Sequence, residues 1–87
     1  PTINVKLPEK REISFVELAE KIENGQRVES FILKSKNDDG AFGVKYYGTT
    51  IGSRKIVPLD ESIITDELLI EITSARDIVE IEWVKLY

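Results

Sequence analysis

The stretch LLIEITSARDIVEIEW, residues 68–83, alternates apolar and polar side chains on both sides of its centre. Such alternation, rich in isoleucine, is typical of β-strands, because successive side chains of a strand point to opposite faces. The central residues Ser74–Asp77 suit a turn, so the stretch is predicted to form a β-hairpin. A helix over 66–78 is the alternative, since Asp66-Glu67-Leu68-Leu69 resembles a helix start, but the two-residue period favours strands.

A loop at Ser74–Asp77 separates the side chains of this hairpin into an apolar face and an acidic face. The apolar face holds Leu68, Ile70, Ile72, Val79, Ile81 and Trp83. On the other face Glu71 lies opposite Glu80, and Glu82 follows two residues later. Like charges directly opposite each other are unfavourable, so this arrangement is one that a sheet usually avoids.

A second hairpin is predicted over residues 28–36 and 41–47, around the turn Asn37-Asp38-Asp39-Gly40. A loop with an even number of residues keeps apolar and basic side chains apart, which favours it over an odd loop. One face would then hold Phe31, Leu33, Phe42, Val44 and Tyr46. The other would hold Ile32, Lys34, Lys36, Lys45 and Tyr47.

A helix is predicted over residues 14–24. Ser14 and Glu17 form a capping box, and Asn24-Gly25 supplies a helix stop. A single apolar stripe at helical spacing follows the cap: Phe15, Leu18, Ala19 and Ile22.

The remaining segments complete an α+β prediction. Residues 2–7 alternate as a half-buried strand, and 49–51 with 55–57 suggest a short hairpin around Gly52-Ser53 that Pro58 ends. Residues 1–87 are thus expected to be a single small domain of the order β-α-β-β-(β)-β-β. One short helix would pack on a mainly antiparallel sheet of about five or six strands.

The composition argues against an enzyme. The 87 residues contain neither cysteine nor histidine, which removes the thiol nucleophile, the commonest general base and most zinc sites. We therefore expect no catalytic residue, no metal and no cofactor. No apolar run approaches about 18 residues, so no membrane segment is expected. The N-terminus does not resemble a signal peptide, which favours the cytoplasm.

The charge is divided unequally along the chain. Residues 1–55 carry ten Lys/Arg and eight Asp/Glu, whereas residues 56–87 carry two Lys/Arg and eight Asp/Glu, which gives +2 and −6 and sums to −4. The first functional hypothesis is an accessory or inhibitory module that binds a basic surface of another protein through an acidic face. That face comprises Asp66, Glu67, Glu71, Glu80 and Glu82. The alternative is an ordinary solvated sheet face beside a basic strand of the same protein.

A second hypothesis is nucleic-acid binding by the basic hairpin within residues 34–55. Lysines for phosphates and an aromatic ring for base stacking are the components that single-strand binding requires. The candidate residues are Lys34, Lys36, Lys45, Tyr47, Arg54 and Lys55. The net negative charge of the chain opposes this function.

Two further possibilities concern the ends of the sequence. Pro1 carries a secondary amine that can act as a general base in an apolar pocket. In Pro1 and in the order strand–helix, the start of the chain is similar to the tautomerase family, which implies a Pro1-dependent enzyme. Removal of an initiator methionine is the preferred explanation of Pro1. Val84 and Leu86 fall on the otherwise acidic face of the strand 78–87, which is consistent with a homo-oligomer through that strand.

Overall fold

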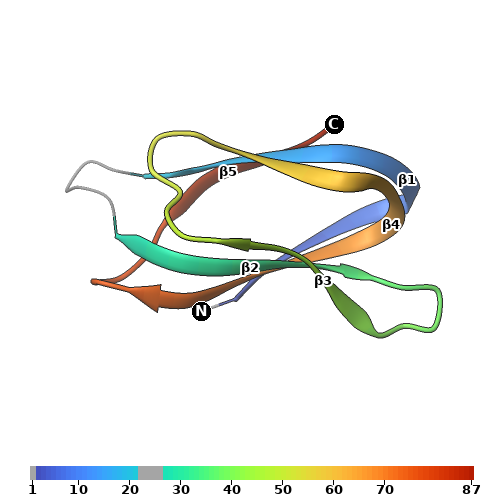
Figure 1. Ribbon diagram of the computed structural model, residues 1–87, viewed down its shortest axis with the longest axis horizontal. Coiled ribbons are helices and arrows are strands. Elements are labelled where there is room, and N and C mark those ends of the chain that lie inside the picture. Colours follow the sequence, from blue (N-terminus) through green and yellow to red (C-terminus); the bar gives the residue numbers. More distant parts are fainter. Residues whose placement is uncertain (1, 22–26) are drawn as a thin grey trace.

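Five antiparallel strands form the fold in the computed structural model, which describes residues 2–21 and 27–87. They are β1 (Thr2–Glu20), β2 (Val28–Lys36), β3 (Phe42–Gly48), β4 (Lys55–Ala75) and β5 (Ile81–Leu86). They belong to one sheet with the order β3-β2-β4-β1-β5 (Figure 1). The described ranges contain no helix, and therefore none that could span a membrane.

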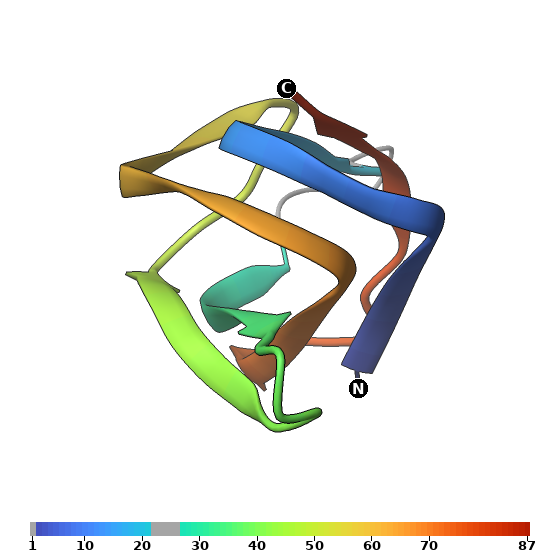
Figure 2. The ribbon, with the colours of Figure 1, turned by 90° about the vertical axis from the view of Figure 1, so that its right-hand side faces the viewer.

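Strands β1 and β4 are long, and both bend. The start of β1 pairs with the end of β4, as in Thr2 opposite Glu71, and the end of β1 pairs with the start of β4, as in Leu18 opposite Lys55. The pairing register shifts between Lys6 and Arg11 and again between Ile13 and Phe15, breaks that β-bulges and bends produce. Figure 2 shows the blue β1 and the yellow-to-orange β4 turning sharply, so the single sheet folds over into two layers. The first layer contains β3, β2, the 67–75 half of β4 and the start of β1; the second contains the 55–65 half of β4, the end of β1 and β5.

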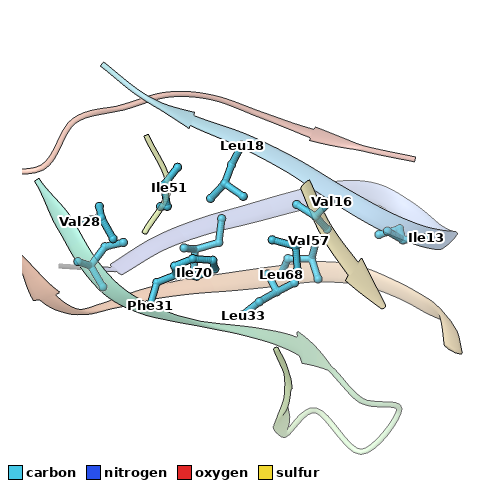
Figure 3. Close-up of a cluster of buried hydrophobic side chains, with 11 residues drawn as sticks. Ile13, Val16, Leu18, Val28, Phe31, Leu33, Ile51, Val57, Leu68 and Ile70 are labelled. Carbon is cyan, nitrogen blue, oxygen red and sulfur yellow. The ribbon is translucent and has the colours of Figure 1, made fainter. Parts of the chain in front are cut away.

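The hydrophobic core lies between the two layers (Figure 3). Strands β1, β2 and β4 contribute most of it, and Ile51 enters from the loop that precedes β4. Its buried members are Ile13, Val16, Leu18, Val28, Phe31, Leu33, Ile51, Val57, Leu68, Ile70 and Ile72. Burying aliphatic and aromatic side chains of this size stabilises a fold by about 1.5–3 kcal/mol for each, so this cluster is the main source of stability.

A buried carboxylate joins three segments at one end of the core. Glu20 is 2% exposed, and its Oε1 accepts hydrogen bonds from the backbone N–H groups of Arg27 and Val28, at 3.0 Å each. Its Oε2 accepts one from the backbone N–H of Gly52, at 2.9 Å. The end of β1, the start of β2 and the turn before β4 are therefore held by one side chain.

The predicted α+β class is wrong, because Ser14–Glu20 belongs to β1 rather than to a helix. This part of β1 lies between β4 and β5 and pairs with both, so backbone hydrogen bonds on two sides replace those of a helix. A helix of about 11 residues is marginal without tertiary contacts, which lets sheet pairing decide. The predicted helix stop at Asn24-Gly25 lies outside the described residues, as does Pro1.

The strand prediction for residues 68–73 is confirmed, and the alternative helix over 66–78 is wrong. The predicted pairing is wrong as well. Strand β4 pairs with β1 and β2, whereas β5 pairs with β1, where Trp83 lies opposite Ala19. The C-terminal half of β4 and β5 belong to different layers, so residues 76–80 connect one layer to the other and Glu71 lies opposite Thr2 and Ile32 rather than Glu80.

The β2–β3 hairpin is confirmed, but its register differs from the prediction. Lys36 pairs with Phe42 across an odd-numbered loop, in which Gly40 adopts a φ of 87° that favours glycine. The register then shifts at Lys45, so Tyr46 returns to the core face opposite Leu33. Phe42 and Val44 consequently lie on the outer face, against expectation.

The short hairpin predicted at residues 49–57 is only half present. A turn occurs at Gly52, which has a φ of 69°, but residues 49–51 form no strand. Strand β4 continues through Pro58 instead of ending there. Proline is tolerated because this part of β4 pairs with β1 alone, and its other edge needs no N–H donor.

Candidate functional site

A groove lies between the free edge of β3 and the bend of β4. Its larger part has a volume of about 460 Å³ and is lined by Val44, Lys45 and residues 59–63. A smaller hollow of about 270 Å³ continues it, lined by residues 35–38, Lys45 and residues 63–64. Because Lys45 and Ile63 line both parts, we treat them as one site and call it the β3–β4 groove. The bend of β4 and the β2–β3 hairpin, which border it, lie at the same end of the molecule in Figure 1.

Two irregularities of the sheet create this groove. The register shift at Lys45 inserts one extra residue in β3, so this lysine is left without a partner residue in β2. The register between β1 and β4 shifts a second time between Ile13 and Phe15, so Leu59–Ser62 have no partner residue in β1, and this second bend of β4 borders the groove. Strand β2 pairs only with residues 68–75 of β4, so the space between β3 and this bend stays open.

The groove combines an apolar strip with charged groups that are available to a ligand. Val44, Leu59 and Ile63 supply the apolar part. Within residues 2–21 and 27–87, the side chains of Lys45, Asp60 and Glu61 make no hydrogen bond or ion pair with the protein. Polar atoms nevertheless contribute most of the exposed lining, so this groove is more polar than the typical small-molecule site.

The rim of the smaller hollow carries an exposed ion pair. The ammonium group of Lys10 donates a hydrogen bond of 2.9 Å to Oδ1 of Asp38. This hydrogen bond and the accompanying charge attraction lower the pKa of the Asp38 carboxyl and raise the pKa of Lys10. The pair therefore links the bend of β1 to the β2–β3 loop.

We expect the substitution Lys10→Met to raise the pKa of Asp38 toward its ordinary value. A carboxyl whose pKa is lowered by folding adds stability at neutral pH, and this contribution disappears as the pH falls through the lowered pKa. An NMR titration of the Asp38 carboxyl carbon in both proteins measures the shift. Lys6→Met is the control, since Lys6 is also exposed on β1 and does not contact Asp38. An unchanged Asp38 midpoint in Lys10→Met would show that the ion pair is not formed in solution.

The five predicted acidic residues do not form one face. Glu71 and Glu67 lie on the outer side of the first layer, where they pair with Lys34 and Lys36 at 3.0 and 3.7 Å. Asp66 lies next to this pair in β4. Glu80 precedes β5 and lies 3.9 Å from Lys21, and Glu82 is exposed on β5 in the second layer. The arrangement matches the alternative in which a basic strand of the same protein lies beside the acidic one.

The predicted basic residues are also dispersed. Besides the ion-paired Lys34 and Lys36, Arg54 contacts Glu17 at 3.1 Å and Lys55 lies 5.8 Å from the Tyr46 ring centroid. Tyr47 is 73% exposed on the outer face of β3. All members of the predicted basic set lie within the described ranges, and among them Lys45 alone lines both hollows.

Sequence reasoning did not identify Leu59, Asp60, Glu61, Ser62 and Ile63 as parts of a site. Ser62 donates a hydrogen bond of 3.1 Å to Oε2 of Glu12, which anchors the bend of β4 to β1. The available signal was a polar run, Asp60-Glu61-Ser62, inside a segment of β-branched residues. Such an interruption marks a place where a strand leaves the core, but it does not show which residue comes to lie across from it.

No model of a known protein family matches the chain, and no curated protein matches it. Solved structures do. A candidate α-L-fucosidase from Bacteroides ovatus matches with a TM-score of 0.91 and 30% identity, over 100% of this chain and 15% of that one. A Ruminococcus gnavus GH29 fucosidase, solved in complex with fucose, matches with a TM-score of 0.84 and 22% identity, over 99% and 17%.

A smaller protein shares the fold as well. The family 32 carbohydrate-binding module of EndoD from Streptococcus pneumoniae has a TM-score of 0.81 and 14% identity, over 99% of this chain and 68% of that one. The chain thus spans less than a fifth of the two fucosidases described above and about two thirds of the module. Its structural neighbours are domains of fucosidases and a carbohydrate-binding module. The prediction of an α+β protein-interaction module is corrected accordingly: the chain is all-β and its neighbours belong to carbohydrate-active proteins.

Proposed function

We propose that this chain is a non-catalytic carbohydrate-binding domain that holds a neutral sugar in the β3–β4 groove. The observation that carries the proposal is the fold that this chain shares, over 99% of its own length, with the pneumococcal carbohydrate-binding module. The groove supports the proposal because it offers both kinds of contact that a sugar ring needs. A sugar has apolar C–H groups on its faces and hydroxyl groups around its edge.

The charged side chains of the groove suit the hydroxyl groups of a sugar. The Lys45 ammonium group donates hydrogen bonds, whereas the carboxylates of Asp60 and Glu61 accept them. One sugar hydroxyl can therefore accept from Lys45 while its neighbour donates to a carboxylate. Val44 and Leu59 would lie against the C–H face. Because two carboxylates accompany one ammonium group, an anionic sugar would be repelled, and a neutral sugar is the better ligand.

The small share of each fucosidase that this chain matches supports a role beside a catalytic domain. The chain is similar to a small part of each of those enzymes, 15% and 17% of their length. A weak sugar-binding domain linked to an enzyme raises the local concentration of substrate through a tether, even when its own affinity is low. We infer that this chain acts in that way rather than by cleaving a glycosidic bond itself.

Binding to a panel of immobilised neutral and acidic glycans, followed by calorimetric titration with L-fucose and D-galactose, tests this function. We expect Lys45→Ala and Asp60→Ala each to weaken binding of the best neutral sugar about tenfold, because each removes a hydrogen bond with a charged partner, worth about 1.5 kcal/mol. Lys6→Ala and Glu82→Ala are matched controls outside the groove and should bind as the parent does. Absence of binding to every glycan, or equal affinity in all four variants, would contradict the proposal.

A further inference from the structure

A row of exposed apolar side chains follows the outer side of strand β3. In β2, the side chains of Ile32, Lys34 and Lys36 alternate along one side of the strand. Their partners in β3 are Tyr47, Val44 and Phe42, in that order. The three side chains therefore share one face, which we call the outer β3 face. Their exposed fractions are 36%, 41% and 73%, although apolar side chains of this size are usually buried.

The outer β3 face is continuous with the β3–β4 groove. Val44 belongs to both, because it also lines the larger part of the groove. The partners of Phe42 and Tyr47 in β2 are four residues apart, so the two rings are separated by about 13 Å along the strand. A single sugar ring does not bridge such a distance, whereas a short oligosaccharide does.

The charges next to this face neutralise each other. Lys34 pairs with Glu71, and Lys36 pairs with Glu67, at 3.0 and 3.7 Å. The surface beside the exposed rings therefore has polar groups but little net charge. Such a surface suits a neutral ligand with hydroxyl groups better than a polyanion. The ammonium groups of Lys34 and Lys36 already pair with carboxylates, so neither is free to bind a phosphate.

The shape of β3 also argues against a second copy of this chain as the occupant. β3 is the edge strand of the sheet, and the extra residue at Lys45 interrupts its ladder of backbone groups. Bulges and lysines on an edge are features that oppose edge-to-edge pairing.

We propose that the outer β3 face is a second sugar subsite, at which Tyr47 and Phe42 stack on residues of a neutral oligosaccharide whose end lies in the β3–β4 groove. This inference rests on the proposed function and extends it from a monosaccharide to a chain. Aromatic rings provide the flat apolar surface against which the C–H face of a sugar packs. The domain would then bind neutral glycans with an affinity that increases with their length.

Calorimetric titration with three probes of increasing length, L-fucose, 2′-fucosyllactose and lacto-N-fucopentaose I, tests the inference. We expect the parent protein to bind the pentasaccharide at least tenfold more tightly than fucose. Tyr47→Ala and Phe42→Ala should each reduce pentasaccharide affinity about five- to tenfold and leave fucose binding unchanged. Ile78→Ala is the control, because Ile78 is 75% exposed in the connection before β5 and away from both sites.

The possible failures are distinguishable. If fucose binds in a Lys45-dependent manner but affinity does not increase with length, or the increase survives in Tyr47→Ala, the second subsite is refuted while the groove stands. If none of the three probes or the panel glycans binds, both proposals fail. If sedimentation shows a dimer that Tyr47→Ala dissociates, the face serves self-association and the subsite is refuted.

Discussion

Replacing Glu20 by alanine is expected to destabilise the protein by about 3–5 kcal/mol. The carboxylate is 2% exposed and accepts three backbone hydrogen bonds, so its removal leaves the N–H groups of Arg27, Val28 and Gly52 without this acceptor. A buried donor without a partner costs about 1–3 kcal/mol. A domain of 87 residues has a total stability of about 4–13 kcal/mol, so the loss is a large part of it.

Urea denaturation followed by the fluorescence of Trp83 measures this effect. Glu20→Gln is the informative second variant, because its amide can still accept from Arg27 and Val28 while its NH₂ group faces the N–H of Gly52. We expect it to be destabilised by about 2 kcal/mol, between the parent and alanine. Glu82→Ala, at an exposed position of β5, is the control and should change stability by less than about 0.5 kcal/mol. A similarly small effect of Glu20→Ala would show that the three hydrogen bonds do not hold this end of the core.

The substitution Gly48→Ala is expected to destabilise the protein by about 2–3 kcal/mol. A Cβ atom at this position would lie 2.2 Å from Cε1 and 2.3 Å from Cζ of Phe31. The Phe31 ring is 1% exposed and fully enclosed by the core, so it cannot move aside. Overpacking of a filled core has a penalty of this size.

A double-mutant cycle separates this clash from other effects of the added methyl group. Phe31→Leu removes the ring atoms that the new Cβ would meet, so Phe31→Leu with Gly48→Ala should be less destabilised than the sum of the two single variants by about 1–2 kcal/mol. Gly43→Ala is the matched control in the same strand, because its Cβ would meet only the flexible amide of Asn37, at 3.2 Å. Additive effects in the cycle would show that the Gly48–Phe31 contact is not the cause.

Several features of the fold follow directly from the order of residues. The two-residue alternation in 2–7, 28–36 and 68–73 predicted strands correctly, because side chains of a strand alternate whatever the strand pairs with. The turn at Asn37–Gly40 was also readable, since glycine accepts the positive φ observed at Gly40. These are local properties, and each can be read without knowledge of a partner.

The segment Ser14–Glu20 shows where local reasoning fails. Its apolar residues satisfy a helical spacing and also a strand that is buried in the middle of a sheet, so the pattern alone does not choose between them. The choice is made by β4 and β5, which pair with this segment from both sides. The same dependence on tertiary structure explains why a buried Glu20 was not anticipated.

In the candidate site, too, some residues could be predicted from the sequence and others could not. The sequence alone identified Lys45 and Tyr47 as exposed residues of a hairpin, because basic and aromatic side chains alternate there. Only the tertiary structure brings Asp60 and Glu61 to the same groove as Lys45, through a bulge in β3 and a bend in β4. Residues from distant parts of the chain meet because one long sheet folds over to bury its apolar face, and that folding is set by the whole core rather than by any local motif.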